Sequence, residues 1–205
     1  MFNAGTARTG LQVEGNQQHV IATADSSGFV NAIYKVHDHY EAFFDPHTFC
    51  SQRVTKDSQE GSRSRQSELR LDYTRRKAVY DEKNLKTGEL KHVEDDVPQC
   101  VSDVVSGFYY LASLPLQPDS TATFTIDDGG KSSDVSAHVE GREQVKVPAG
   151  TFQTVRVRID PISGPMKGKG TVWSWFTDDA NHTPVQMRSK LGFGTLLFHL
   201  QRIEK

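Results

Sequence analysis

The feature of this sequence that most constrains its fold is an alternation of apolar and polar residues that recurs along the chain. Residues 68–73 place Leu, Leu and Tyr in alternation with Glu, Arg and Asp, and residues 121–126, 154–159 and 185–188 alternate in the same way. Successive side chains of a strand point to opposite faces of a sheet, so each run predicts a strand with one buried and one solvated face. The pattern is typical of antiparallel sheets.

Turn signals lie between these runs. Residues 84–88, 127–130, 148–150 and 178–181 are rich in Gly, Pro, Asn and Asp, which favour tight connections. Residues 161–170 predict a longer, flexible loop, and the polar residues 55–65 predict a long, exposed hairpin tip. Hairpins that follow one another in this way predict a meander.

One segment has the spacing of a helix. Apolar residues of the range 101–114 recur with a period near 3.6, Asp103 is expected in the first turn, and Pro115 ends the segment. Gly107 inside the run weakens the helix by about 1 kcal/mol relative to alanine. Residues 28–36 fit a short helix or a strand equally well. We therefore predict a mainly β fold in which a curved antiparallel meander sheet, an open or partial barrel, carries one helix on its concave face. Residues 1–205 are expected to form a single β-rich domain.

The charge and hydropathy of the chain exclude several classes of partner. The formal net charge is −2 and the pI is near 6.4, so no extended basic footprint for nucleic acid or an anionic membrane is expected. No apolar run reaches the roughly 20 residues of a membrane-spanning helix. Met1 and Phe2 lead directly into residues 4–7 without the basic start and apolar stretch of a signal peptide. Either the protein is cytoplasmic or the sequence is the mature part of an exported protein.

The two cysteines, Cys50 and Cys100, match no metal-binding spacing. They are either two unrelated thiols or one disulfide, which would stabilise the fold by about 4 kcal/mol and would indicate an oxidising compartment.

Few residues suggest a metal site or a catalytic site. His37 and His39 would share one face of a strand and are weak candidates for a metal site, although histidines on a solvated strand are ordinary. Asp178, Asp179 and His182 are better explained by turn formation than by acid–base catalysis. The sequence has no nucleophile or phosphate-binding motif. We therefore predict no catalytic residue, no enzymatic activity and no cofactor.

Aromatic and apolar residues gather in the predicted helix and the last strands. They either pack the helix against the sheet or line an apolar cavity able to hold an acyl chain. The candidate cavity residues are Phe108, Tyr109, Leu111, Trp173, Trp175, Phe193 and Phe198.

The sequence also resembles the bacterial domain-of-unknown-function 3108 family, a group of mostly exported proteins. The resemblance extends over most of the chain, in residues 4–7, 33–36, 40–41, 44–46, 103–110, 145–152, 175–179 and 184–185. The stretches 145–152 and 175–185 are the most specific, because a hairpin and an aspartate turn follow in the expected order. The resemblance implies a signal peptide that has been removed, a periplasmic or envelope location, and a Cys50–Cys100 disulfide. It supplies no catalytic residues.

Together these features predict a non-enzymatic protein that binds a hydrophobic ligand such as a lipid or acyl chain. The alternative is a structural or protein-interaction module of the cell envelope, which would bind an envelope protein.

Overall fold

A computed structural model describes residues 3–191 and 194–204 of the chain and divides it into two compact units. The first unit comprises the residues up to Ser106 together with Asp127–Lys131. The second comprises Gly107–Ile126 and the residues from Ser132 onward.

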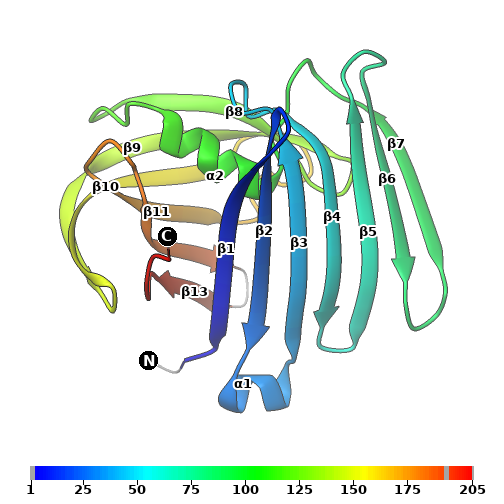
Figure 1. Ribbon diagram of the computed structural model, residues 1–205, viewed down its shortest axis with the longest axis horizontal. Coiled ribbons are helices and arrows are strands. Elements are labelled where there is room, and N and C mark those ends of the chain that lie inside the picture. The colour runs from blue at the N-terminus through cyan, green and yellow to red at the C-terminus, as the bar shows by residue number, and fades with distance from the viewer. Residues whose placement is uncertain (1–2, 192–193, 205) are drawn as a thin grey trace. The chain divides into compact units, whose positions relative to one another are not determined.

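The first unit is a seven-stranded antiparallel sheet in which each strand pairs with the next one along the chain (Figure 1). A six-residue helix, α1 (Gly28–Ile33), lies between its second and third strands. The strands are β1 (Gly5–Glu14), β2 (Gln17–Ser26), β3 (Val36–Phe44), β4 (Ser51–Glu60), β5 (Arg63–Asp72), β6 (Lys77–Asn84) and β7 (Leu90–Asp96).

The strand alternation of the sequence places one apolar cluster on a single face of this sheet. Ala42 pairs with Val54, and Val54 pairs with Leu69, so that these side chains lie side by side. The buried cluster consists of Ala42, Val54, Leu69, Leu71, Ala78, Val97 and Val101. We call the face that carries it the inner face and the opposite one the outer face.

The second unit contains a six-stranded sheet in the order β13-β12-β11-β10-β9-β8, again with sequential neighbours. Its strands are β8 (Thr121–Asp127), β9 (Ser132–Val147), β10 (Gly150–Pro161), β11 (Thr171–Thr177), β12 (Pro184–Leu191) and β13 (Gly194–His199). One face carries the main core, namely Leu111, Leu116, Ile126, Val135, Ala137, Val139, Val155, Val157, Ile159 and Phe176. Opposite it lies a smaller cluster of Val145, Val147, Trp175 and Val185.

The predicted helix is α2 (Val104–Ser113), which contributes its first three residues to the first unit and the others to the second. The sequence predicted Asp103 in the first turn of this helix. That prediction was wrong, because Asp103 precedes the helix and caps its N-terminus. Its Oδ1 accepts hydrogen bonds from the backbone N–H groups of Val105 and Ser106 at 2.8 and 3.0 Å. A side chain at Gly107 would lie only 3.2 Å from the Phe124 ring, which explains a glycine inside the helix.

The predicted mainly β, antiparallel meander is confirmed, with its strands divided between two sheets and with α2 packed on the second. The ambiguous residues 28–36 form α1 and the start of β3. The interpretation of residues 55–65 as an exposed tip was wrong, because most of them belong to β4 and β5, and only Gly61 and Ser62 form the turn. Among the described residues, no helix is long and apolar enough to cross a membrane.

Candidate functional site

The inner face of the first sheet changes character along its strands. At one end it carries the apolar cluster, and toward the turn between β4 and β5 it carries charged and polar side chains. On strand β4, for example, the buried Val54 is followed on the same face by Lys56, Ser58 and Glu60. A sheet face is expected to be apolar where it belongs to a core, so this charged half indicates a site rather than packing.

A pocket of about 200 Å³ lies over this charged half of the inner face. Its floor includes Val54 and Leu69, and two tyrosines, Tyr40 and Tyr80, stand in its wall. Its other lining residues are Lys56, Ser58, Glu60, Arg63, Arg65, Ser67, Glu82, Asp103, Val104, Asp127, Asp128 and Gly129. All belong to the first unit.

Most of the charges in and beside the pocket are paired. The Lys56 ammonium lies 3.2 Å from Asp38 and 3.0 Å from Glu60, and Arg65 lies 3.4 Å from Glu82. Arg63 is exposed and forms no ion pair with any residue that the structure describes. Its guanidinium is therefore free to bind an anionic group.

Burial and pairing shift the pKa values of these groups. Burial raises the pKa of Asp38 more than the charge of Lys56 lowers it. Burial lowers the pKa of Lys56, but hydrogen bonds and attraction to Glu60 and Asp38 outweigh it and raise that pKa. Burial and a hydrogen bond to Glu82 raise the pKa of Tyr80 to about 12. At neutral pH Tyr80 is therefore a neutral donor.

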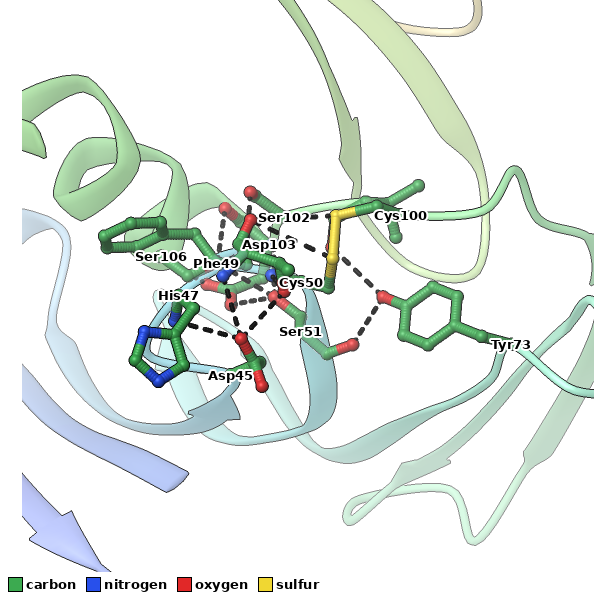
Figure 2. The surroundings of a disulfide bond; sticks show 12 residues. Asp45, His47, Phe49, Cys50, Ser51, Tyr73, Cys100, Ser102, Asp103 and Ser106 are labelled. Atoms are coloured by element: carbon green, nitrogen blue, oxygen red, sulfur yellow. Dashed lines mark hydrogen bonds between the residues drawn. A yellow bond between two sulfur atoms is a disulfide. The ribbon is translucent and has the colours of Figure 1, made fainter. Parts of the chain in front are cut away.

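Beside the pocket lies a buried polar cluster centred on Asp103, shown in Figure 2. Asp103 Oδ1 accepts a hydrogen bond from the Tyr40 hydroxyl at 2.6 Å, and Oδ2 accepts one from Ser51 at 2.6 Å. The Ser51 and Ser106 hydroxyls lie 2.8 Å apart, and both accept from the Asp103 backbone N–H. The carboxylate is thus fully engaged in structural bonds.

The disulfide lies at the edge of this cluster (Figure 2). Cys50 and Cys100 are bonded, which confirms the second of the two alternatives for the cysteines. Next to the bond, the Ser51 N–H donates to the Val101 carbonyl at 2.8 Å. The Tyr73 hydroxyl donates to the carbonyls of Ser51 and Val101 at 2.5 and 3.1 Å. The crosslink therefore fixes the segment that leads into α2 against the start of β4.

The pairing of Ser51 with Asp103 does not form a nucleophile. Ser51 and Ser106 are both 0% exposed, so a substrate cannot reach either hydroxyl. The cluster is an interior hydrogen-bond network that caps α2.

The seven residues predicted to line an apolar cavity are not brought together. Phe108 and Leu111 pack in the main core of the second unit, whereas Trp173 and Trp175 pack in the smaller cluster on the opposite face of that sheet. Tyr109 is half-buried on α2, Phe198 on β13 is 40% exposed, and Phe193 lies outside the described residues. Neither core cluster contributes a residue to the pocket of the first unit.

The two candidate metal ligands lie on the outer face and bind carboxylates. His37 Nδ1 lies 2.5 Å from Asp25, and His39 Nε2 lies 2.8 Å from Glu41, which also contacts His19. Within the described part of the chain, no group of three or more His, Cys, Asp or Glu side chains is arranged to hold a metal ion.

Comparison with known proteins identifies the family. The model of the family described as "Protein of unknown function (DUF3108)" matches residues 1–201. The chain belongs to this family. The match confirms the resemblance that the sequence motifs predicted, and it covers both units of the DUF3108 chain.

A solved structure shares the fold. The beta-barrel-like protein of domain of unknown function DUF1849 from Brucella abortus superimposes on the DUF3108 chain with a TM-score of 0.66 at 11% identity. The match covers 97% of this chain and 86% of the other. At this identity the likeness concerns the fold alone. No curated protein matches the chain.

Proposed function

We propose that this DUF3108 protein is a non-catalytic binding protein of an oxidising, extracytoplasmic compartment. We propose further that it holds a small amphipathic ligand, a short acyl chain with an anionic end, in the pocket of the first unit. The observation that carries the proposal is that an unpaired Arg63 and the apolar residues Val54 and Leu69 line one pocket on the inner face of a sheet.

Part of the pocket lining supports this ligand class, and of its five acidic residues Glu60, Glu82 and Asp103 bind Lys56, Arg65 and the Tyr40 hydroxyl. Val54, Leu69 and the tyrosine rings offer apolar contact, while Arg63 offers two parallel N–H donors to a carboxylate. The volume of about 200 Å³ is below the roughly 300–1,000 Å³ of pockets that enclose drug-sized ligands, which favours a short chain. This site replaces the cavity near α2 as our candidate, because Phe108 and Leu111 pack in a core.

The disulfide supports the compartment. Crosslinks of this kind persist in oxidising compartments and are rare in the cytosol. Export is therefore part of the proposal. So is the absence of enzymatic activity, because His37 and His39 bind carboxylates on the outer face and the hydroxyls of the Asp103 cluster are buried.

Titration with octanoate and decanoate, followed by calorimetry and native mass spectrometry, tests the ligand. Ser67→Trp places a bulky ring in the pocket and should weaken binding by about tenfold or more. Gln66→Trp, at the neighbouring exposed residue on the outer face, is the matched control and should leave binding unchanged.

The role of the cation is tested separately. Arg63→Gln should remove the preference for a fatty acid over the corresponding alcohol, because the charge-assisted hydrogen bonds are lost. Equal affinity of the wild type and Ser67→Trp for every chain length would refute the pocket, and absence of any acyl binding would refute the ligand class.

A second candidate function rests on the edge strand β1. Nine of its ten residues are exposed, and Leu11 and Val13 project into solvent. A long edge strand with few charges is a template for the addition of a strand from another protein. A partner bound in this way would slow hydrogen exchange at the amides of β1 and leave the pocket of the first unit accessible.

A further inference from the structure

One end of the first sheet gathers three connections that the sequence keeps far apart. In a meander, alternate turns lie at the same end, so α1, the β4–β5 turn and the β6–β7 turn are neighbours (Figure 1). Two backbone hydrogen bonds confirm this: the Gly61 N–H donates to the Lys35 carbonyl at 2.7 Å, and the Leu85 N–H donates to the Ser64 carbonyl at 2.8 Å. We call this end, formed by residues 27–35, 61–63 and 83–90, the α1 edge.

Large apolar side chains project from the α1 edge into solvent. Phe29 is 75% exposed, Ile33 is 70% exposed and Leu90 is 76% exposed, with Tyr34 and Leu85 about half exposed. Helix α1 has no buried residue, although its sequence, Gly-Phe-Val-Asn-Ala-Ile, is largely apolar. Apolar residues that gather at one end of a protein without joining its core indicate an interaction surface.

Cations stand between these apolar residues. Lys35 adjoins α1, and Arg63 follows the β4–β5 turn. Lys83 lies near the end of β6, and Lys86 lies in the β6–β7 turn. None of the four side chains forms an ion pair with a described residue. The acidic residues of this edge are Glu89 and, next to the β4–β5 turn, Glu60, which shares the Lys56 ammonium with Asp38. The edge is locally positive even though the chain has a net charge of −2.

We propose that the α1 edge docks on the surface of a membrane that contains anionic lipids. Phe29, Ile33 and Leu90 would enter the boundary between headgroups and acyl chains, while the lysines and Arg63 contact the lipid phosphates. This is attachment to a surface and not a membrane span. It shares Arg63 with the pocket, but it rests on other apolar residues and on three lysines outside the pocket, and it would hold if the pocket bound nothing.

The mixture of residues favours a membrane over a second protein. The buried centre of a protein interface is depleted of lysine and forms one continuous apolar patch. On the α1 edge the apolar side chains belong to separate connections with cations between them, which suits a fluid surface that carries phosphate groups.

Flotation with lipid vesicles tests the proposal on the whole protein. We expect binding to vesicles of equal parts phosphatidylcholine and phosphatidylglycerol, weaker binding to phosphatidylcholine alone, and loss of binding as salt screens the charges. The variant Phe29→Ser with Ile33→Ser should bind about tenfold or more weakly, because two apolar side chains no longer leave water. Lys35→Glu with Lys86→Glu should abolish the preference for phosphatidylglycerol.

Val13→Ser is the matched control. Val13 is also 75% exposed, but it lies beside the β1–β2 turn, at the end of the sheet opposite to the α1 edge. It should bind vesicles as the wild type does. Circular dichroism of each variant should show a folded protein, because both α1 positions are exposed. Equal vesicle binding by the α1 variant and the wild type would overturn the proposal. So would failure of the wild type to bind phosphatidylglycerol vesicles, or a wild-type dimer that the α1 variant dissolves.

Discussion

Two tyrosine hydroxyls in the first unit act as hydrogen-bond donors to groups that cannot donate in return. Tyr40 donates to the Asp103 carboxylate, and Tyr73 donates to the carbonyls of Ser51 and Val101. Both bonds require the neutral phenol. Burial, together with the charge of Asp103, raises the pKa of Tyr40 well above its ordinary value, and burial raises the pKa of Tyr73 from 10.0 to about 12.

The raised pKa of Tyr73 makes folding sensitive to alkaline pH. Above pH 10.0 the unfolded chain loses the Tyr73 proton while the folded chain keeps it to about pH 12. The stabilisation is therefore fully present below the unfolded pKa and is lost as the pH rises through the folded one. We expect the free energy of unfolding, measured in urea between these pH values, to fall less steeply in Tyr73→Phe. Tyr34→Phe, at an exposed tyrosine, is the control, and an unchanged slope in Tyr73→Phe would contradict the assignment.

The pocket of the first unit could not be predicted from its individual residues. The pocket residues Lys56, Ser58 and Glu60 alternate with the polar Thr55, Asp57 and Gln59, so no contrast between faces is visible in that stretch. The available signal was the strand register, because Val54 belongs to the apolar face and Lys56 continues that face two residues later.

At the scale of elements, α2 depends on its cap. Asp103 is 1% exposed and binds two backbone N–H groups of the first turn as well as the hydroxyls of Tyr40 and Ser51. The sequence indicated the helix through its apolar spacing but placed its start too early. Residues 101–102 instead pair with the start of β4 and with the Asp127 N–H, contacts from distant parts of the chain that no local pattern predicts.

Removing the cap should destabilise the protein strongly. Asp103→Ala leaves the N–H groups of Val105 and Ser106 and two hydroxyls without their acceptor, and we expect a loss of about 3 kcal/mol or more in the free energy of unfolding. Asp57→Ala, which removes an exposed carboxylate from β4, should change it by about 0.5 kcal/mol or less. Urea unfolding followed by far-ultraviolet circular dichroism measures both, and similar values for the two variants would show that the network contributes little.

At the scale of the whole molecule, the strands and their antiparallel succession were predictable because period-2 alternation and turn residues are local signals. The division into two sheets was not, since it depends on β7 and β8 failing to pair across the segment that contains α2. The aromatic residues of α2 and β11 were expected around one cavity, but Phe108 packs in the main core, whereas Trp173 and Trp175 pack in the cluster on the opposite face of the sheet. Spacing shows which side chains share a face, and only the packing of elements decides which face meets which.

The disulfide is the covalent constraint at this scale, because Cys50 immediately precedes β4 and Cys100 follows β7. Replacing both cysteines by serine should lower the free energy of unfolding by about 4 kcal/mol, chiefly by freeing the unfolded chain. The reduced wild type is the control and should match the double variant in urea unfolding. A loss below about 1 kcal/mol would show that the loop is already ordered in the unfolded chain.

The same bond closes strands β4 to β7 into a covalent ring. A peptide bond cut anywhere between Cys50 and Cys100 therefore opens the ring without dividing the polypeptide. A protease that cleaves at one of the arginines or lysines of these strands would leave two fragments joined by the disulfide. In gel electrophoresis they would migrate together until a reductant is added. In a compartment that contains proteases, four of the seven strands of the first sheet thus remain attached after a single cleavage.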